Sequence, residues 1–172
     1  MKLPTLDIRL LHAADAAAFK KLRLQAINDS PSAIWPTYEE EASRTIEEVQ
    51  ARILTTDTQS VVGAFIDEEL VGIAGLRREA LAQVRHKATL WGVFISPDYR
   101  RAGLARRLFA HVVSHARKQG VLQIHLCVNA DNARARHLYR SLGFSPFGLE
   151  PRAMRIGDSY FDEEHMVLRL DD

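Results

Sequence analysis

The chain has 172 residues, about the length of one domain on the usual scale of ~150 residues per domain. Its hydrophobic fraction of 47% and charged fraction of 26% are ordinary for a globular protein and exclude a disordered chain or a collagen-like repeat. A formal net charge of +1 supplies no general attraction for a polyanion, so the composition predicts no nucleic-acid binding. The single cysteine, Cys127, excludes an internal disulfide and disfavours a structural zinc site.

Membrane and targeting segments are not predicted from the sequence. No apolar run reaches the ~18 residues that a membrane-spanning helix needs. The stretch from Met1 to Asp15 carries acidic residues and lacks the long apolar core of a signal peptide. We therefore expect one cytoplasmic domain over residues 1–172 with no membrane partner, and the sequence leaves a homodimer open.

The hydrophobic pattern along the chain alternates between helical and strand spacing. Apolar residues at intervals of three and four indicate helices, whereas continuous or alternating apolar runs indicate strands. Thr37 and Glu40 form a capping box that opens the second helix, and Gly120 and Gly143 follow the ends of two later helices. In chain order we expect a strand at 7–11, helices at 15–29 and 37–54, strands at 61–66, 70–76 and 88–95, a helix at 103–118, a strand at 122–128, a helix at 132–142 and a strand at 161–170.

The strand expected at 88–95 is interrupted by Gly92, which indicates a bulge or the close approach of a ligand. Simple alternation along this strand places Trp91, Val93 and Ile95 on one face and Phe94 on the other. Successive hairpins followed by two helical crossovers predict an α/β (α+β) fold with a single mixed sheet flanked by helices.

The segment from Arg100 to Ala105 lies between a predicted strand and a predicted helix, which makes it a candidate anion site. The first backbone N–H groups of a helix lack internal partners, and the helix dipole adds partial positive charge there. Small side chains would let a phosphate reach the backbone, and arginines would add fixed charge. The small residues are Ala102, Gly103 and Ala105, and the arginines are Arg100, Arg101 and Arg106. The alternative is an arginine-rich helix start on a solvated surface.

The run from Val93 to Ala105 resembles the signature of the GNAT superfamily of acyl-CoA-dependent N-acyltransferases. That signature is an apolar strand, a proline-containing loop and then Arg/Gln-x-x-Gly-x-Gly/Ala. A second segment, with Asn132, Leu138-Tyr139 and Leu142-Gly143-Phe144, is similar to the Asn…Leu-Tyr…Gly-Phe segment of the same family. Because the two segments stand in the family's order, separated by a helix and a strand, the resemblance is specific.

The resemblance implies the GNAT fold, with a mostly antiparallel sheet that is splayed at its centre. It further implies an N-acetyltransferase that moves an acetyl group from acetyl-CoA to a primary amine of a small molecule or peptide, by direct attack in a ternary complex. The implied cofactor-binding residues are Val93, Phe94 and Ile95 along the pantetheine, Arg100, Arg101, Ala102, Gly103, Leu104, Ala105 and Arg106 around the pyrophosphate, and Asn132 and Tyr139 along the CoA arm. Tyr139 is also implied as the catalytic acid toward the leaving thiolate.

One position departs from the family pattern, because Cys127 stands where many members place a glutamate base. We interpret Cys127 as a small buried hydrophobe rather than an acyl-carrying nucleophile. His86 is the candidate catalytic base, since an unperturbed histidine pKa of ~6.5 suits proton removal near neutral pH, but its place toward the far end of the strand slightly favours a route without a dedicated base. The alternatives are His165, Asp162 and Glu163, or a route that passes the amine's proton to ordered water.

The acceptor is expected to enter over the first two helices and to touch Trp35 and Tyr38, whose surroundings suit a cationic or aromatic amine. No metal is expected, because His111 and His115 have metal-like spacing but lack the neighbouring glutamate of a zinc enzyme. Two other functions stay open at this point. One is a non-catalytic acyl-CoA-binding or regulatory module on the same fold, and the other is nucleic-acid binding by the arginine-rich helices.

Overall fold

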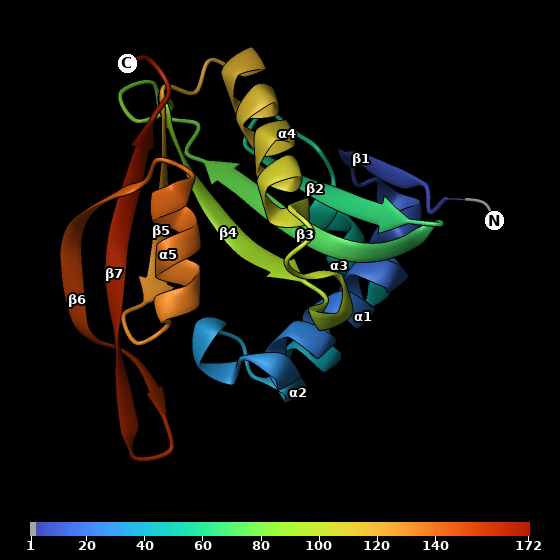
Figure 1. The fold of residues 1–172 in the computed structure, drawn as a ribbon, viewed down its shortest axis with the longest axis horizontal. Helices are drawn as coiled ribbons and strands as arrows, with labels where there is room; N and C mark the ends of the chain where they lie inside the picture. Colours follow the sequence, from blue (N-terminus) through green and yellow to red (C-terminus); the bar gives the residue numbers. More distant parts are fainter. Residues whose placement is uncertain (1–2) are drawn as a thin grey trace.

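The computed structural model describes residues 3–172, whose strands form one seven-stranded sheet in the order β1-β2-β3-β4-β5-β7-β6 (Figure 1). The strands are β1 (Leu6–Leu10), β2 (Gln59–Ile66), β3 (Glu69–Arg78), β4 (Lys87–Ile95), β5 (Gln123–Asn129), β6 (Ser145–Ile156) and β7 (Ser159–Arg169). Neighbouring strands run antiparallel except β4 and β5, which are parallel. The expected mixed, mostly antiparallel sheet is thereby confirmed.

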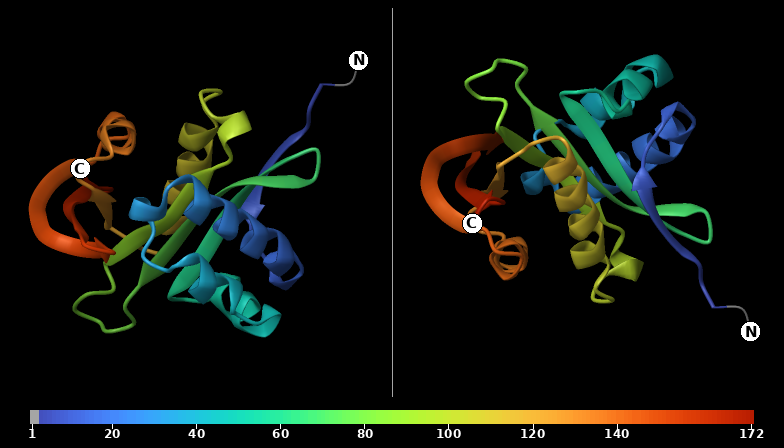
Figure 2. Two further views of the ribbon diagram at one scale, coloured as in Figure 1. Left: turned by 90° about the horizontal axis from the view of Figure 1, so that it is seen from below. Right: turned by 90° about the horizontal axis from the view of Figure 1, so that it is seen from above.

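Helices cover both faces of this sheet (Figure 2). They are α1 (Ala16–Asp29), α2 (Tyr38–Ala42), α3 (Ile46–Ile53), α4 (Leu104–Lys118) and α5 (Ala133–Ser141). The first three lie on one face, and α4 and α5 lie on the other. Within residues 3–172, no helix is both long and apolar enough to cross a bilayer.

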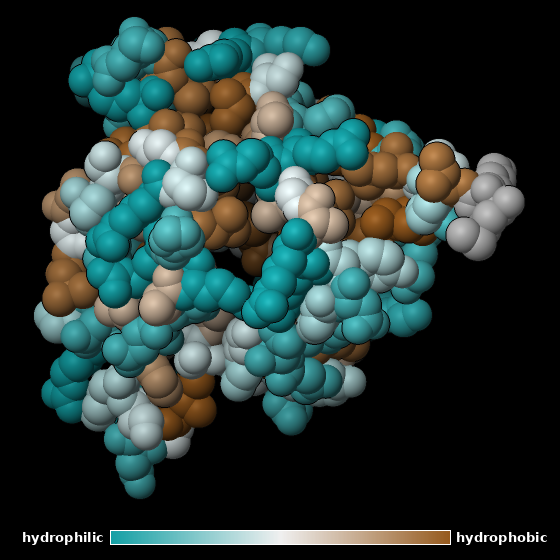
Figure 3. Space-filling view, viewed as in Figure 1, coloured by the Kyte–Doolittle hydropathy of each residue, from teal (hydrophilic) through white to brown (hydrophobic). Residues whose placement is uncertain are grey.

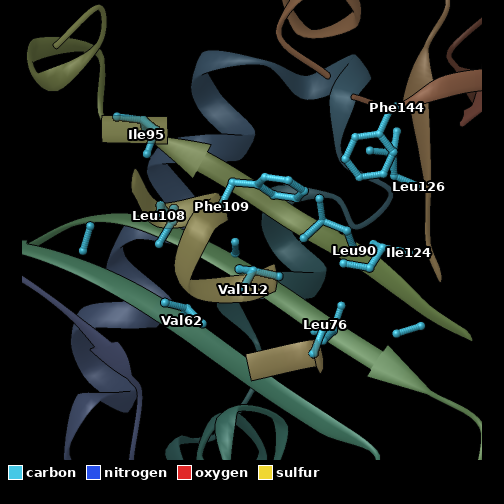
Figure 4. Packing of buried hydrophobic residues seen from close by; sticks show 14 of the residues in the cluster. Val62, Leu76, Leu90, Ile95, Leu108, Phe109, Val112, Ile124, Leu126 and Phe144 are labelled. Atoms are coloured by element: carbon cyan, nitrogen blue, oxygen red, sulfur yellow. The ribbon is translucent and has the colours of Figure 1, made fainter. Parts of the chain in front are cut away.

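Two apolar clusters hold the layers together, one on each face of the sheet. Under α4, the side chains of Leu108, Phe109 and Val112 pack against the sheet (Figure 4). The other cluster joins Phe19 of α1 and Ile53 of α3 to the opposite face. Burial of these side chains is the main force that fixes the helices on the sheet.

The helix expected at 37–54 is wrong in extent, because the structure has two short helices in its place. Helix α2 ends at Ala42, and α3 begins after Thr45. Thr45 accepts a hydrogen bond from the Glu48 N–H while Glu48 accepts one from the Thr45 N–H, which is a second capping box. A capping box satisfies the free N–H groups of a new helix, so the chain restarts here instead of continuing.

The C-terminal strand expected at 161–170 is one arm of a long hairpin formed by β6 and β7. Strand β7 begins two residues earlier, at Ser159, and β6 is a second C-terminal strand that the sequence leaves open without bounds. From Ser145 to Arg152 the residues of β6 are exposed, so this strand lacks the apolar alternation that identifies buried strands.

The bulge expected at Gly92 is confirmed, and it lies in the part of β4 that does not pair with β5. The two strands pair only from Lys87 to Thr89, and the register against β3 shifts in the segment that contains Gly92. Gly92 has a φ of +63°, a conformation that side chains disfavour. Because the bulge adds one residue to β4, the side chains after Gly92 point to the faces opposite to those that simple alternation predicts. Trp91 and Phe94 join the α1 cluster while Val93 and Ile95 join the α4 cluster, so the predicted shared face of Trp91, Val93 and Ile95 is wrong.

Candidate active site

A cleft of about 700 Å³ opens where β4 and β5 separate. Its wall combines the helical layer of α1, α2 and α3 with the facing strands. The lining residues are Arg23, Ala33, Ile34, Trp35, Pro36, Glu40, Arg44, Arg52, Gln59, Arg77, Thr89, Leu90, Trp91, Gly92, Cys127 and Glu163. Beyond Thr89, the edge of β4 that faces β5 has no strand partner among residues 3–172. The cleft therefore lies beside free backbone hydrogen-bonding groups.

The turn that precedes α4 leaves its N-terminal backbone groups available. Gly103 is the N-cap residue of α4 and provides no side-chain cap, so the first N–H groups have no partner from it. Arg101 and Gly103 have left-handed φ angles of +66° and +74°, and a Cβ at Gly103 would meet open space. Figure 3 shows the molecular surface hollowed beside this turn, with hydrophilic side chains around the hollow. Free N–H groups at the start of a helix are groups that can bind an anion.

Two of the arginines near this turn are engaged within the protein. Arg100 donates to the carbonyl of Ile95 at 2.9 Å and to the carboxylate of Asp29 at 2.8 Å. This ion pair lowers the pKa of Asp29 from its usual value. Arg106 reaches the backbone carbonyl and hydroxyl of Ser141, where α5 ends. Arg100 thus fastens the turn to α1 and β4.

Asn132 is the N-cap residue of α5, and Tyr139 lies in the last turns of the same helix. The side chain of Asn132 accepts a hydrogen bond from the N–H of Ala135, so it caps α5. Tyr139 is half-buried, and its ring packs edge-on against Phe144 with centroids 5.8 Å apart. Burial raises the pKa of the Tyr139 hydroxyl to about 12, so the hydroxyl keeps its proton at neutral pH.

Cys127 lines the cleft and is exposed, which corrects the expectation of a buried hydrophobe. Its Sγ lies 3.3 Å from Nδ1 of His165, and Nε2 of that ring lies 3.1 Å from a carboxylate oxygen of Glu150. Partial burial, followed by the negative charges of Glu163 and Glu150, raises the pKa of the Cys127 thiol to about 11. A thiol that stays protonated is a poor nucleophile, so the arrangement does not favour an acyl-cysteine.

Glu163 is a carboxylate that sequence analysis names only as an alternative base, and the structure places it in the cleft. The residue is 5% exposed, and its Oε1 accepts a hydrogen bond from Nε1 of Trp35 at 2.8 Å. Its Oε2 is buried without a hydrogen-bond partner. Since buried polar atoms are nearly always satisfied, this oxygen is suited to receive a donor from a bound molecule.

A charged cluster on the helical side of the cleft centres on Glu41, which is completely buried. Three arginines surround its carboxylate, with nitrogen–oxygen distances of 3.5 Å to Arg23, 3.8 Å to Arg44 and 2.9 Å to Arg52. Arg23 itself is 3% exposed. Burial, together with the neighbouring positive charge of Arg44, lowers the pKa of the Arg23 guanidinium, while Glu41 opposes that shift.

The side chain of Trp91, on β4, packs against the charged cluster of Glu41 and its arginines. The guanidinium of Arg52 stacks 4.9 Å from the ring centroid, and that of Arg23 lies at 5.8 Å. The ring fits because position 75 on β3 is glycine, since a Cβ at Gly75 would come within 2.2 Å of it. The Trp91 Nε1 atom is buried without a partner. Sequence analysis missed this group, although Arg23 stands on the buried stripe of α1 beside Leu22, where a charge is unusual.

The remaining predicted residues fall into two groups. Trp35 lines the cleft, whereas Tyr38 begins α2 and is not among the cleft residues. His86 is exposed and precedes β4, six residues before Gly92, which is ~20 Å at ~3.3 Å per strand residue. The structure therefore brings together Trp35, Cys127 and Glu163, but it does not bring His86 to the cleft.

Comparisons with known proteins agree with this geometry. Residues 23–144 match the model of the acetyltransferase (GNAT) family. Over 62 residues, the chain is 45% identical to the ribosomal protein bS18-alanine N-acetyltransferase of Escherichia coli K12. This stretch covers 36% of the chain and 42% of that relative. The chain spans less than half the length of the curated relatives it matches.

Two solved structures share the fold over nearly the whole chain. The acetyltransferase of GNAT family from Streptococcus pneumoniae has a TM-score of 0.86 at 24% identity, over 96% of this chain and 99% of that one. The protein yncA of Salmonella typhimurium, solved with its cofactor acetyl-CoA, has a TM-score of 0.82 at 24% identity, over 98% of this chain and 95% of that one. The expected sheet with flanking helices is thus a known arrangement of this fold.

Proposed function

Because the chain belongs to the acetyltransferase (GNAT) family, we propose that it transfers an acetyl group from acetyl-CoA to a primary amine of a small molecule or peptide. The single observation that carries the proposal is the separation of β4 from β5 beyond Thr89, on the strand that leads to the uncapped N-terminus of α4. A thioester held in that gap would face the cleft, where an amine can approach. Direct attack in a ternary complex then needs both molecules bound together.

The residues around the gap fit acetyl-CoA. The edge of β4 from Val93 to Ile95, which has no strand partner on the β5 side, offers backbone groups to the amides of a pantetheine arm, except for the Ile95 carbonyl that already accepts a hydrogen bond from Arg100. The N–H groups from Arg101 to Arg106 offer donors to a pyrophosphate, and the helix dipole favours its negative charge. Bound acetyl-CoA supplies the activated acetyl group, and the protein supplies orientation. Asn132 keeps a side-chain NH₂ for the same molecule, because its capping bond uses only its oxygen.

Tyr139 is proposed as the acid that protonates the leaving thiolate. A tyrosine hydroxyl is protonated across the neutral range, so it has a proton to donate, while the burial that raises its pKa to about 12 makes it a weaker acid in the absence of substrate. The edge-on contact with Phe144 fixes the ring on α5. This role is one for which a phenylalanine cannot substitute.

The amine's proton has a shorter route than the one through His86. His86 lies at the far end of β4 from Gly92, so its use as a base requires a long chain of water. Glu163 is a carboxylate already in the cleft, with one free oxygen. The case for a non-catalytic acyl-CoA-binding module depended on the lack of a carboxylate near Cys127, and Glu163 removes that ground.

The test is release of CoA thiol from acetyl-CoA in the presence of a panel of primary amines. We expect turnover with some amines. We also expect acetyl-CoA at ~100 times its dissociation constant to stabilise the fold by about 2.7 kcal/mol. Gly103→Val should abolish most of that stabilisation, because the side chain blocks backbone approach and the φ of +74° disfavours it. Unchanged melting at millimolar acetyl-CoA would refute the function.

A further inference from the structure

We propose that the acceptor is an amino acid-like zwitterion, whose anionic group is bound by the arginines of the cleft while its amine meets Glu163. The proposal rests on the proposed function and names the substrate class of the same cleft. It replaces the expectation of a purely cationic or aromatic amine, because the charges that line the cleft are mainly positive. The shared chemistry is an amine with a nearby carboxylate, supplied by a free amino acid or by a short peptide.

The charge of the helical wall is the first support. Three guanidiniums share one carboxylate, Glu41, so two positive charges in this cluster lack an acid partner. Arg77 adds a further positive charge to the lining. Glu40 also lines the cleft, but its carboxylate accepts the N–H of Thr37 as part of a helix cap. Because unpaired buried charge is costly, an anion that fills the cleft would complete the cluster.

The positions of the unpartnered polar atoms of Trp91 and Glu163 are the second support. Trp91 Nε1 is a buried donor without a hydrogen-bond partner, and Trp91 lines the cleft. The buried Nε atoms of Arg23 and Arg44 make no hydrogen bond, but they lie 3.5 and 3.8 Å from the carboxylate of Glu41. The corresponding buried acceptor without a partner is Glu163 Oε2, on β7. The unpartnered donor is therefore on β4, and the unpartnered acceptor is on the strand beside β5. A ligand that satisfies both must carry a hydrogen-bond acceptor and an N–H donor, and the positive charge of the helical wall favours an anionic acceptor.

The two functional groups of such a ligand would be held for reaction. Arg23 lies at the bulge, because a Cβ at Gly92 would be 3.2 Å from its Nη1. A carboxylate bound there stands next to the gap between β4 and β5. Trp35 holds Oε1 of Glu163, which leaves Oε2 for the amine. An N–H···carboxylate bond orients the amine and offers a place for its proton. An N-terminal amine of a long polypeptide has no carboxylate beside it and would leave the arginines unpaired.

The first experiment compares each L-amino acid with its carboxamide in the thiol-release assay. The amide has the more weakly basic amine and hence more of the reactive neutral form, so intrinsic reactivity favours the amide. We expect the opposite order, with kcat/KM at least about tenfold higher for the preferred acid, which is about 1.4 kcal/mol. Dipeptides with free and amidated C-termini distinguish the two sources of the carboxylate. Equal or better rates with amides, or with the N-terminus of a long peptide, would overturn the proposal.

The second experiment changes the arginines that are least important for folding. Arg44→Gln combined with Arg77→Gln should raise KM for the acid at least about tenfold, change kcat little, and bring the acid-to-amide ratio toward one. Arg85→Gln is the matched control, because Arg85 is exposed and lies outside the cleft lining. Retained binding of acetyl-CoA shows that each variant is folded. A double variant that keeps the selectivity of the parent would contradict the assignment of the arginines.

A binding measurement separates this proposal from the proposed function. Calorimetry with CoA present compares the N-acetyl amino acid with its N-acetyl amide, and it needs no turnover. Tighter binding of the acid, lost in the double variant, supports the substrate class even in an inactive preparation. Turnover of amines without preference for a carboxylate sustains the function and refutes the substrate class.

Discussion

The candidate site has two adjoining halves, the cleft assigned to the acceptor and the region beside it assigned to acetyl-CoA, and the two use different chemical groups. The half assigned to acetyl-CoA consists largely of backbone, and its main groups lie within one stretch from Val93 to Arg106. The half assigned to the acceptor consists of side chains from α1, the α2–α3 region, β4 and β7, brought together from Arg23 to Glu163. Recognition by backbone needs a particular local conformation, so it leaves a short sequence pattern. Recognition by side chains from distant segments leaves none.

Tyr139→Phe is the variant with the largest expected effect, because it tests the one side chain assigned to chemistry in the half built from backbone. Turnover should fall by roughly 10²–10⁴-fold, the usual contribution of a general acid, while acetyl-CoA affinity stays the same. Steady-state kinetics and calorimetry measure the two quantities. Normal turnover would show that the thiolate leaves without this proton, and that the half consists of backbone alone.

Glu41→Gln tests whether the acceptor half depends on buried charge. Removing the shared carboxylate leaves Arg23, Arg44 and Arg52 without their common partner, which should lower the free energy of unfolding by about 3 kcal/mol. Urea unfolding at neutral pH measures the change. Glu47→Gln, at an exposed position in the first turn of α3, should change it by less than about 0.5 kcal/mol. If Glu41→Gln and Glu47→Gln have equal free energies of unfolding, the acceptor half does not depend on buried charge.

Asp29→Asn tests the ion pair that fastens the backbone turn to α1. Because Arg100 lowers the pKa of folded Asp29 below the unfolded ~3.9, the stabilisation is fully present above that pH and disappears as the pH falls through the folded value. The pair is partly exposed, so the loss at pH 7 should be at most about 1 kcal/mol. Unfolding curves across pH 2–7 should converge at the acid end. The exposed Asp98→Asn serves as the control.

Cys127→Ala has the smallest expected effect, although the residue lies between the halves. Its thiol pKa of about 11 keeps it protonated at neutral pH, so direct attack by the amine requires nothing from it. Turnover should stay within about twofold of the parent, since no catalytic contribution is removed. Intact mass after incubation with acetyl-CoA should show no acetylated enzyme. A stable acetyl adduct, lost in Cys127→Ala, would instead indicate a covalent route.

The contrast between the halves also explains what the sequence could predict. The turn before α4 and the bulge at Gly92 were predictable, because glycine and the helix start act locally. The family resemblance, which depends on the same local residues, predicted that the sheet is splayed at its centre. Glu163 was one of several acids and histidines, and only the pairing of β5 with β7 places it in the cleft. His86 had a suitable pKa as a free side chain, but the length of β4 separates it from Gly92.

Some misses had signals in the sequence, and others had none. The pattern Thr45-x-x-Glu48 is a second capping box, and it marks the restart between α2 and α3. Strand β6 had no comparable signal, because an edge strand exposed over most of its length needs no apolar alternation. After Gly92, the side chains of β4 lie on the faces opposite to those predicted, because the bulge adds one residue to the strand. Apolar alternation alone does not show where such a residue is added.

Gly92 links the evolution of the two halves. Substitutions around Arg44 and Arg77 can change which acceptor is taken while the backbone turn at Gly103 stays the same. At position 92 that independence ends. A side chain at position 92 would disfavour the φ of +63° that the bulge requires. Its Cβ would also lie only 3.2 Å from Nη1 of Arg23. On the proposed assignment, substitutions at the rim of the cleft can change the range of acceptors without affecting acetyl-CoA. A single mutation at Gly92 would disturb the binding of both substrates.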